Sequence, residues 1–244
     1  ANSNFVKERI KRHWNKDSVV INPTINFKSF FHSSDKGYYI VISELVPYKR
    51  IDLVIKAFNK NNKKLMIVGN GPLMDELKLL SKTNIEFTGY VSDYKKISLL
   101  SESKALVFPG IEDFGIVPLE AQACGTPVIA YGKGGALETV KVGKTGLFFK
   151  EQTEAALIAA ITSFEQKVED WDAIGIRKHA ETFDTSRFKS KFNSYVDQHF
   201  EDFYDSYFSG EKESDDDTLL IKIEEGIRFK ISSPQLNHEI EIFK

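Results

Sequence analysis

The sequence predicts an α/β fold, a doubly wound and mostly parallel sheet that extends from about Tyr38 to Thr182. Two observations predict it. Six short β-forming runs recur along the chain, with helical patterns between them. Most of these runs are apolar throughout, which is typical of strands buried on both faces of a parallel sheet, with a buried helix segment as the alternative for any single run. Because strands separated by helices need right-handed crossovers, helices are expected on both faces of the sheet.

The six predicted strands, in chain order, are Tyr38–Ile42, Leu65–Val68, Ile85–Thr88, Ala105–Phe108, Val128–Tyr131 and Gly146–Phe149. Between the first two lies one apolar stripe with helical spacing, formed by Ile51, Val54, Ile55 and Phe58. Further helices are predicted to begin at Pro72, at Asp93 as N-cap, and near Pro118 as a first-turn proline. The residues expected to face inward are Leu73, Leu77 and Leu80 in the first of these helices, and Tyr94, Ile97 and Leu100 in the second.

The two ends of the chain differ from the central pattern. Asn2 to Asn15 is predicted to be a helix with a basic face; contact with anionic lipid is one interpretation, and a solvated face is favoured for so short a run. An amphipathic helix after Asp184 is expected to close the domain. The acidic stretch Gly210–Thr218 indicates a solvated linker. Beyond it, Leu219–Lys230 and Glu239–Phe243 alternate as a hairpin does, and an edge ribbon or the start of another module is equally compatible.

Composition excludes several classes of protein. The 244 residues are 41% hydrophobic and 28% charged, which fits one or two globular domains. The net charge of −2 gives no reason to expect a nucleic-acid partner. A single cysteine, Cys124, excludes an internal disulfide and a multi-cysteine zinc site, and is typical of the cytoplasm. The longest apolar stretch, Ala155–Ile161, is too short to span a bilayer, and the polar start of the chain does not predict a signal peptide.

Polar or glycine-rich clusters directly follow five of the predicted strands, and these clusters are Ser43–Arg50, Gly69–Pro72, Gly89–Asp93, Pro109–Gly115 and Gly132–Gly135. In a parallel sheet these loops all emerge at one edge. Ligands of open α/β sheets bind there, outside the carboxyl ends of the strands. The simpler alternative, that the glycines only close turns, leaves the charged residues in the loops unexplained. The pair Gly69 and Gly71 is by itself a weak signal.

The fourth loop and the helix after it carry the most chemical information. The backbone N–H groups of Gly115, Ile116 and Val117 are expected to be unpaired donors at a helix N-terminus, suited to an anion such as a diphosphate. Lys49 and Arg50 would supply countercharge. Two carboxylates eight positions apart, Glu112 and Glu120, can each accept two hydroxyl hydrogen bonds, which indicates a sugar. A surface glutamate is the alternative for Glu120, but its small apolar neighbours indicate a tightly packed helix.

Other catalytic motifs are absent from the sequence: the Walker lysine pattern, His-Glu-x-x-His, Gly-x-Ser-x-Gly and histidine pairs with metal-ligand spacing. The scattered histidines are interpreted as structural or solvated.

Taken together, the motifs resemble the carboxyl-terminal domain of the retaining GT-B glycosyltransferases of family 4, and in particular the mannosyltransferase branch that builds O-antigen and other surface polysaccharides. The branch-specific signal is the run Ser43–Leu53. The general family marks are Val68–Pro72, Phe87–Val91, the Glu-x7-Glu element from Glu112 to Glu120, Gly125–Ala130, Gly134–Val140 and Gly143–Leu147. The resemblance covers about Ala1 to Phe192.

The resemblance implies that Lys49 contacts the donor diphosphate, Glu112 the transferred sugar and Glu120 the ribose, while Tyr90 and Val91 flank the base. Lys49 and Glu112 are therefore the candidate catalytic residues. The candidate donor-binding residues are Arg50, Gly69, Gly71, Tyr90, Val91, Asp113, Phe114, Gly115, Ile116, Val117 and Glu120.

The sequence departs from the family pattern in two places. Many members carry an arginine where this chain has Glu44, so a phosphate-binding role is not transferred to that position. The first segment resembles only the last elements of the amino-terminal, acceptor-binding domain. Three regions are therefore expected: residues 1–35 as the end of that domain and a linker, 36–205 as the nucleotide-sugar-binding domain, and 206–244 as an acidic linker and β-rich tail.

These observations predict the donor-binding half of a metal-independent glycosyltransferase, inactive alone, that transfers a hexose from a nucleotide sugar with retention. The donor is expected to be GDP-mannose, with a UDP-sugar as the alternative. The expected partner is a polysaccharide or lipid-linked acceptor, and neither a cofactor nor a nucleic acid is expected. The protein is expected in the cytoplasm or peripherally at the inner face of the membrane. The alternatives are a non-catalytic binding or scaffolding module and a related sugar-nucleotide epimerase or phosphorylase.

Overall fold

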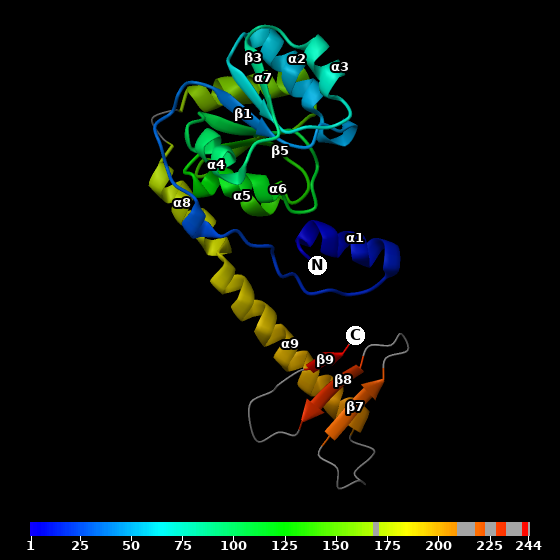
Figure 1. Cartoon of the computed structure of the whole chain (residues 1–244). Coiled ribbons are helices and arrows are strands. Elements are labelled where there is room, and N and C mark those ends of the chain that lie inside the picture. Colours follow the sequence, from blue (N-terminus) through cyan, green and yellow to red (C-terminus); the bar gives the residue numbers. More distant parts are fainter. Residues whose placement is uncertain (168–170, 209–217, 223–227, 233–240, 244) are drawn as a thin grey trace. The chain divides into compact units, whose positions relative to one another are not determined.

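The computed structural model describes residues 1–167, 171–208, 218–222, 228–232 and 241–243. The chain divides into two compact units, Ala1–Ser194 and Tyr195–Lys244. The first unit contains a six-stranded parallel sheet with the strand order β3-β2-β1-β4-β5-β6, coloured from blue to green in Figure 1. The strands are β1 (Tyr39–Ile42), β2 (Leu65–Val68), β3 (Ile85–Gly89), β4 (Ala105–Phe108), β5 (Val128–Tyr131) and β6 (Gly146–Phe149). The predicted α/β class and parallel sheet are confirmed.

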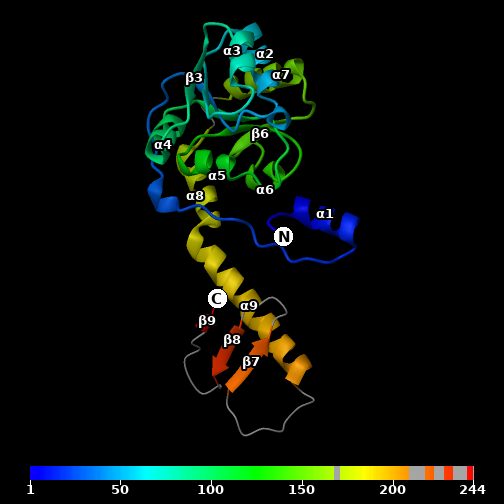
Figure 2. The same cartoon turned by 45° about the vertical axis from the view of Figure 1, so that its right-hand side comes forward.

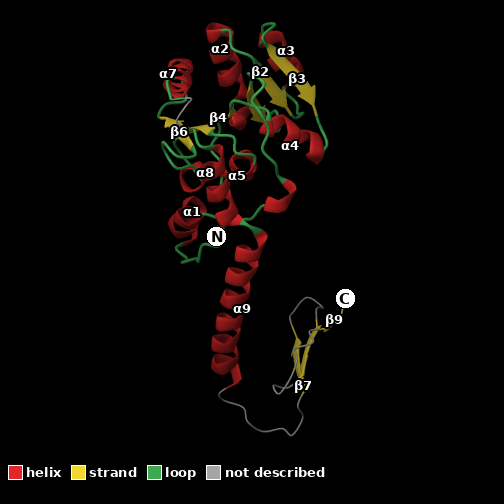
Figure 3. Cartoon of the chain, turned by 90° about the vertical axis from the view of Figure 1, so that its left-hand side faces the viewer, coloured by secondary structure: helices red, strands yellow, loops and turns green. Residues whose placement is uncertain are grey.

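Helices cover both faces of this sheet, as the crossovers require (Figure 3). One face carries α2 (Ile51–Asn61), α3 (Met74–Leu80) and α7 (Glu154–Glu165). The other carries α4 (Asp93–Ser101) and α5 (Ile116–Ala123), with α8 (Ala173–Ala180) packed on α5. The short α6 (Ala136–Thr139) follows β5. Among its described residues, this unit also contains the 3₁₀ turns η1 (Phe27–Ser29), η2 (Pro47–Lys49) and η4 (Glu181–Phe183).

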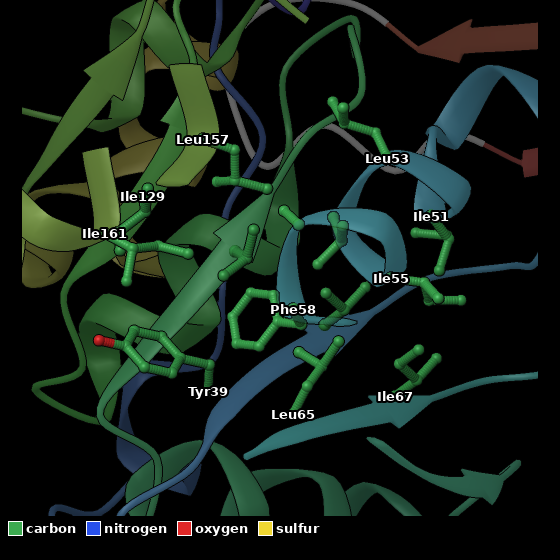
Figure 4. Close-up of a cluster of buried hydrophobic side chains, with 14 of the residues drawn as sticks. Tyr39, Ile51, Leu53, Ile55, Phe58, Leu65, Ile67, Ile129, Leu157 and Ile161 are labelled. Carbon is green, nitrogen blue, oxygen red and sulfur yellow. The ribbon is translucent and has the colours of Figure 1, made fainter. Parts of the chain in front are cut away.

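The apolar stripe predicted after the first strand forms the buried face of α2. It packs with Tyr39 of β1 and with Leu157 and Ile161 of α7 in the largest core cluster (Figure 4). A second cluster, on the opposite face, contains Cys124, whose thiol donates to the carbonyl of Ile97 at 3.7 Å. Both faces of the strands are thus buried, which is why their sequences do not alternate.

Three local predictions were wrong. Ser92, not Asp93, caps α4, because its hydroxyl accepts from the backbone N–H of Lys95. Tyr94 is 75% exposed; it lies in the first turn of α4, and its ring contacts Phe31 instead of the core. Leu80 is exposed because it ends the seven-residue α3, which buries only Leu77.

The predicted N-terminal helix is present as α1 (Asn4–Trp14), and none of its residues is buried. The helix after Asp184 is α9 (Thr185–Phe208); no residue between 185 and 200 is buried, so this part of α9 adds nothing to the core. In the second unit, β7 (Thr218–Lys222) and β8 (Arg228–Ser232) form an antiparallel pair with β9 (Glu241–Phe243) beside β8, which confirms a hairpin. Most of the predicted acidic linker lies outside the described residues.

Candidate functional site

A cavity of about 660 Å³ lies at the carboxyl ends of β1, β2, β3 and β4. Four of the five predicted loops line it, and the fifth, Gly132–Gly135, does not. β1 and β4 are neighbours in the sheet, while the chain after β1 turns to α2 on one face and the chain after β4 turns to α5 on the other. This divergence is the switch point at which doubly wound sheets bind ligands.

Most of the residues predicted for the site line this cavity. They are Lys49, Gly69, Tyr90, Val91, Glu112, Asp113, Phe114, Gly115, Ile116 and Val117. Tyr90 is 85% exposed at the cavity rim. Arg50, Gly71 and Glu120 do not line it. The fold therefore brings together side chains from loops that are widely separated in sequence.

Lys49 and Glu112 form an ion pair across the switch point. Lys49 ends the 3₁₀ turn η2 after β1, and Glu112 lies in the loop Pro109–Gly115, called the Glu112 loop below, after β4. Their side chains are 20% and 21% exposed, so the pair is partly shielded and still faces the cavity. A ligand in the cavity could replace this ion pair by accepting from the Lys49 ammonium and donating to the Glu112 carboxylate.

Two glycines after β5 hold the Glu112 loop in place. The N–H of Gly135 donates to the carbonyl of Glu112 at 2.8 Å. A Cβ at Gly135 would lie 2.2 Å from Cα of Phe114, and one at Gly134 would lie 2.6 Å from the Glu112 carbonyl oxygen. The fifth predicted loop, Gly132–Gly135, thus contacts the backbone of the Glu112 loop without lining the cavity.

The N-terminus of α5 opens into the same cavity. Gly115 precedes the helix with a φ of 86°, a conformation that favours glycine, and no side chain caps the helix. Among the described residues, no acceptor contacts the backbone N–H groups of Gly115, Ile116 or Val117. These unpaired donors and the helix dipole create a site for an anion.

Glu120 does not line the cavity but is held by Lys96, a lining residue that sequence reasoning missed. Lys96 Nζ is 2.8 Å from Glu120 and 3.3 Å from Asp93, and both Lys96 and Asp93 line the cavity. Burial alone would lower the pKa of Lys96, but the two carboxylates outweigh it and raise that pKa. The Asp93–Lys96 spacing on one helix was visible in the sequence, whereas the contact with Glu120 depends on how α4 packs on α5.

Arg50 and Gly71 have structural roles beside the cavity. Arg50 is the N-cap residue of α2, with a φ of 56° in the left-handed region, and its Nε lies 3.2 Å from Asp52. A Cβ at Gly71 would lie within 2.7 Å of the Leu45 backbone, so this glycine lets the first two loops touch. The countercharge predicted from Arg50 is engaged by Asp52.

The cavity lining is acidic overall. Four carboxylates, those of Glu44, Asp93, Glu112 and Asp113, stand against two ammonium groups, those of Lys49 and Lys96. Both lysines are already paired, and no described cation pairs with Glu44. No group of three or more described His, Cys, Asp or Glu residues is arranged to hold a metal ion.

Two more lining residues, Asn2 and Pro23, come from the N-terminal segment. That segment is fastened by Glu138, which accepts hydrogen bonds from Asn4, and by an ion pair between Arg9 and Asp113. No sequence pattern predicts these contacts, because their partners are more than a hundred residues apart. Within the described residues, no helix has the length and apolarity that crossing a bilayer requires.

Comparison with known proteins shows what this architecture is similar to. An uncharacterised glycosyltransferase of Methanocaldococcus jannaschii is 29% identical over 150 residues, covering 59% of this chain and 43% of the relative. A GDP-mannose-dependent alpha-(1-6)-phosphatidylinositol monomannoside mannosyltransferase of Mycolicibacterium smegmatis is 32% identical over 130 residues, covering 46% of this chain and 34% of the relative. The chain thus spans less than half the length of these relatives.

Solved structures agree on the fold. The crystal structure of Anabaena HepE in complex with UDP-glucose superposes with a TM-score of 0.73 at 20% identity, and the match covers 81% of this chain and 63% of HepE. The sequence profile of the glycosyl transferases group 1 matches residues 23–177, which is more than half of the chain and includes every strand of the large sheet. This chain belongs to the glycosyl transferases group 1 family.

Proposed function

We propose that this chain is the donor-binding half of a retaining glycosyltransferase that transfers a hexose, with GDP-mannose as its donor, to a polysaccharide or lipid-linked acceptor. The observation that supports the proposal most is the meeting of Lys49, Glu112 and the N-terminus of α5 in one cavity at the switch point. The preference for GDP-mannose rests on the likeness to a GDP-mannose-dependent mannosyltransferase. Acceptor binding is assigned to a second domain, at the inner face of the membrane.

The proposed chemistry uses charge and backbone donors already present. Lys49 turns from Glu112 to the donor diphosphate, whose other oxygens accept from the N–H groups at the start of α5. Together these groups neutralise the charge that develops on the leaving nucleoside diphosphate, without a metal ion. Glu112, released from Lys49, accepts hydrogen bonds from the hexose hydroxyls and fixes the orientation of the sugar. The family resemblance assigns the ribose to Glu120, which is outside the cavity lining but is held by Lys96, a lining residue.

One observation favours a second candidate, a non-catalytic binding module. The unpaired carboxylate of Glu44 adds to an acidic cavity, and a carboxylate repels a diphosphate. A chain that had lost donor affinity would show no nucleotide binding at all.

The test is calorimetric titration of the chain with GDP, UDP, GDP-mannose and UDP-glucose without added metal. GDP-mannose is expected to bind, with GDP ahead of UDP. Lys49→Ala removes the ammonium that pairs with the diphosphate and should weaken GDP binding roughly tenfold to a hundredfold. Lys150→Ala, which removes an exposed ammonium outside the cavity, is the matched control and should leave binding unchanged.

Glu112→Ala distinguishes the contribution of the sugar to binding from that of the diphosphate. It should weaken GDP-mannose binding while leaving GDP binding intact, because Lys49 is then free for the diphosphate. Equal loss of both ligands would refute the sugar-binding role of Glu112. Failure of every nucleotide to bind would favour the non-catalytic module.

A further inference from the structure

The segment Ala1–Pro23, called the N-terminal arm below, is held to the rest of its unit in an unusual way. It contains α1, in which no residue is fully buried and Phe5, Val6 and Ile10 are half-buried, so apolar packing holds the helix only in part. Figure 2 shows α1 beside α6. Just past the arm, Ile25 is buried in a cluster with Phe114 and Leu119. The arm is therefore anchored beside Ile25, and polar contacts add to the partial burial of α1.

Glu138 of α6 supplies the main polar contact. Its Oε1 accepts from the backbone N–H of Asn4 at 2.8 Å and of Phe5 at 3.4 Å, and its Oε2 accepts from the Asn4 amide at 3.0 Å and the Asn22 amide at 3.3 Å. The carboxylate thus binds both ends of the arm. Asn4 and Phe5 are the first residues of α1, whose own first turn contains no acid. Glu138 therefore supplies the anion that the N-terminus of α1 lacks.

The second contact, between Arg9 and Asp113, is weaker. Their side chains are 50% and 55% exposed, and an ion pair so open to water contributes little. It nevertheless ties the arm to the Glu112 loop. The arm also supplies Asn2 and Pro23 to the cavity wall.

The residues before Glu138 press directly on the Glu112 loop. Gly134 and Gly135 lie against the backbone of Glu112 and Phe114, and the Gly135 N–H donates to the Glu112 carbonyl. A continuous chain of contacts therefore runs from the Glu112 loop through Gly135 and Glu138 to α1.

We propose that Glu138 is a positioning residue that holds the N-terminal arm against the donor cavity, and that the arm and the bound donor stabilise each other. The inference rests on the proposed function, since it takes the occupant of the cavity to be a nucleotide sugar. Two sites that share a structural element influence each other equally in both directions, so the coupling is measurable from either side.

The first measurement follows release of the arm by limited trypsin digestion, with mass spectrometry of cuts after Lys7, Arg9, Lys11 and Arg12. Glu138→Ala should speed these cuts about tenfold, because it removes the carboxylate that accepts from the first N–H groups of α1 and leaves only the N-cap Ser3, which accepts from Val6. Asn4→Ala loses only the side-chain bond and should give an intermediate rate. Glu8→Ala removes an exposed carboxylate of α1 that does not contact Glu138, and it is the matched control.

The second measurement is calorimetric titration of the same variants with GDP-mannose and UDP-glucose. Glu138→Ala should weaken whichever nucleotide sugar binds by at least about fivefold, and saturating that ligand should slow arm cleavage in the wild-type chain by a similar factor. A Glu138 that only stabilised the fold would alter neither the ligand affinity nor the protection by ligand.

The outcomes separate the two proposals. Unchanged cleavage in both Glu138→Ala and Asn4→Ala, or faster cleavage with unchanged affinity, would overturn the role of Glu138 while the donor site stands. No binding of any nucleotide sugar to the wild-type chain would overturn the proposed function, and with it the coupling. If Glu138→Ala does not fold, Asn4→Ala still decides the question, because it breaks the contact from the arm.

Discussion

Gln122 is fully buried in α5, and neither its Nε2 nor its Oε1 contacts a protein hydrogen-bond partner among the described residues. A buried amide without partners costs free energy that an apolar side chain of the same length does not. Gln122→Met should therefore raise the free energy of unfolding by about 1 kcal/mol and the Tm by about 2–4 °C. Thermal unfolding measured by circular dichroism would check this.

The matched control is Gln152→Met. The Nε2 of Gln152 donates to the carbonyl of Pro109 at 2.9 Å, so the same change there should not stabilise the protein. A lower Tm for Gln122→Met than for the wild type would contradict the prediction.

At the residue scale, the sequence could nominate Lys49 and Glu112 because each follows a predicted strand, and parallel strands end at one edge. It could not show that the two side chains pair with each other. It missed Lys96, because the pairing with Glu120 is a property of helix packing. It also did not show that Arg50, predicted to bind the donor, pairs with Asp52 two residues away. Backbone loops were predictable; side-chain partners were not.

At the scale of elements, the contact between Gly135, just before α6, and the Glu112 loop can be tested by substitution. Gly135→Ala would place a Cβ 2.2 Å from the Cα of Phe114, a backbone atom that cannot turn aside. The clash should cost about 1–3 kcal/mol of stability and displace Glu112. Nucleotide-sugar binding should weaken more than nucleoside-diphosphate binding in the titration described above.

Gly143→Ala is the control for this substitution. Gly143 has a φ of 72°, and no atom lies within 4 Å of the place that a Cβ would occupy, so its substitution tests backbone strain alone. It should cost roughly 1–2 kcal/mol and leave ligand binding intact. Equal effects of the two variants on GDP-mannose affinity would show that the contact with Phe114 does not position Glu112.

Most helices and strands could be predicted from the sequence. Strands buried on both faces appear as apolar runs, and α2 as one stripe, because burial dictates the residue types. The errors lie at the edges of elements. Asp93 and Ser92 are both good caps, and only the backbone conformation selects Ser92. Tyr94 has the right spacing for the core but lies one turn too early in α4.

At the scale of the molecule, every buried residue among those whose burial is described lies between Ser3 and Ala180. The cavity is lined by residues of the same unit. A chain ending at Ser194 should therefore fold, with a Tm within a few degrees of the full chain and the same nucleotide affinity. Thermal unfolding and calorimetry of the shortened chain would check both. A loss of cooperative unfolding would show that residues 195–244 complete the core.

The overall architecture was predictable because spacing and burial alone define a doubly wound sheet. The N-terminal arm was not, since its position depends on one carboxylate more than a hundred residues away. Its basic residues favoured a solvated face, and Lys7, Lys11 and Arg12 are exposed, as that interpretation expects. The contacts of its amino end with Glu138 could not be predicted from the sequence.

The rate at which Cys124, the single cysteine, reacts with a thiol reagent reports how often the fold opens. Cys124 is fully buried, and burial raises its pKa to about 12, so the reactive thiolate is scarce while the fold is closed. A thiol reagent therefore labels the chain only as fast as the core around α5 opens. Since α5 also presents its first N–H groups to the cavity, the slowing of labelling by a nucleotide would report its binding free energy without an engineered probe.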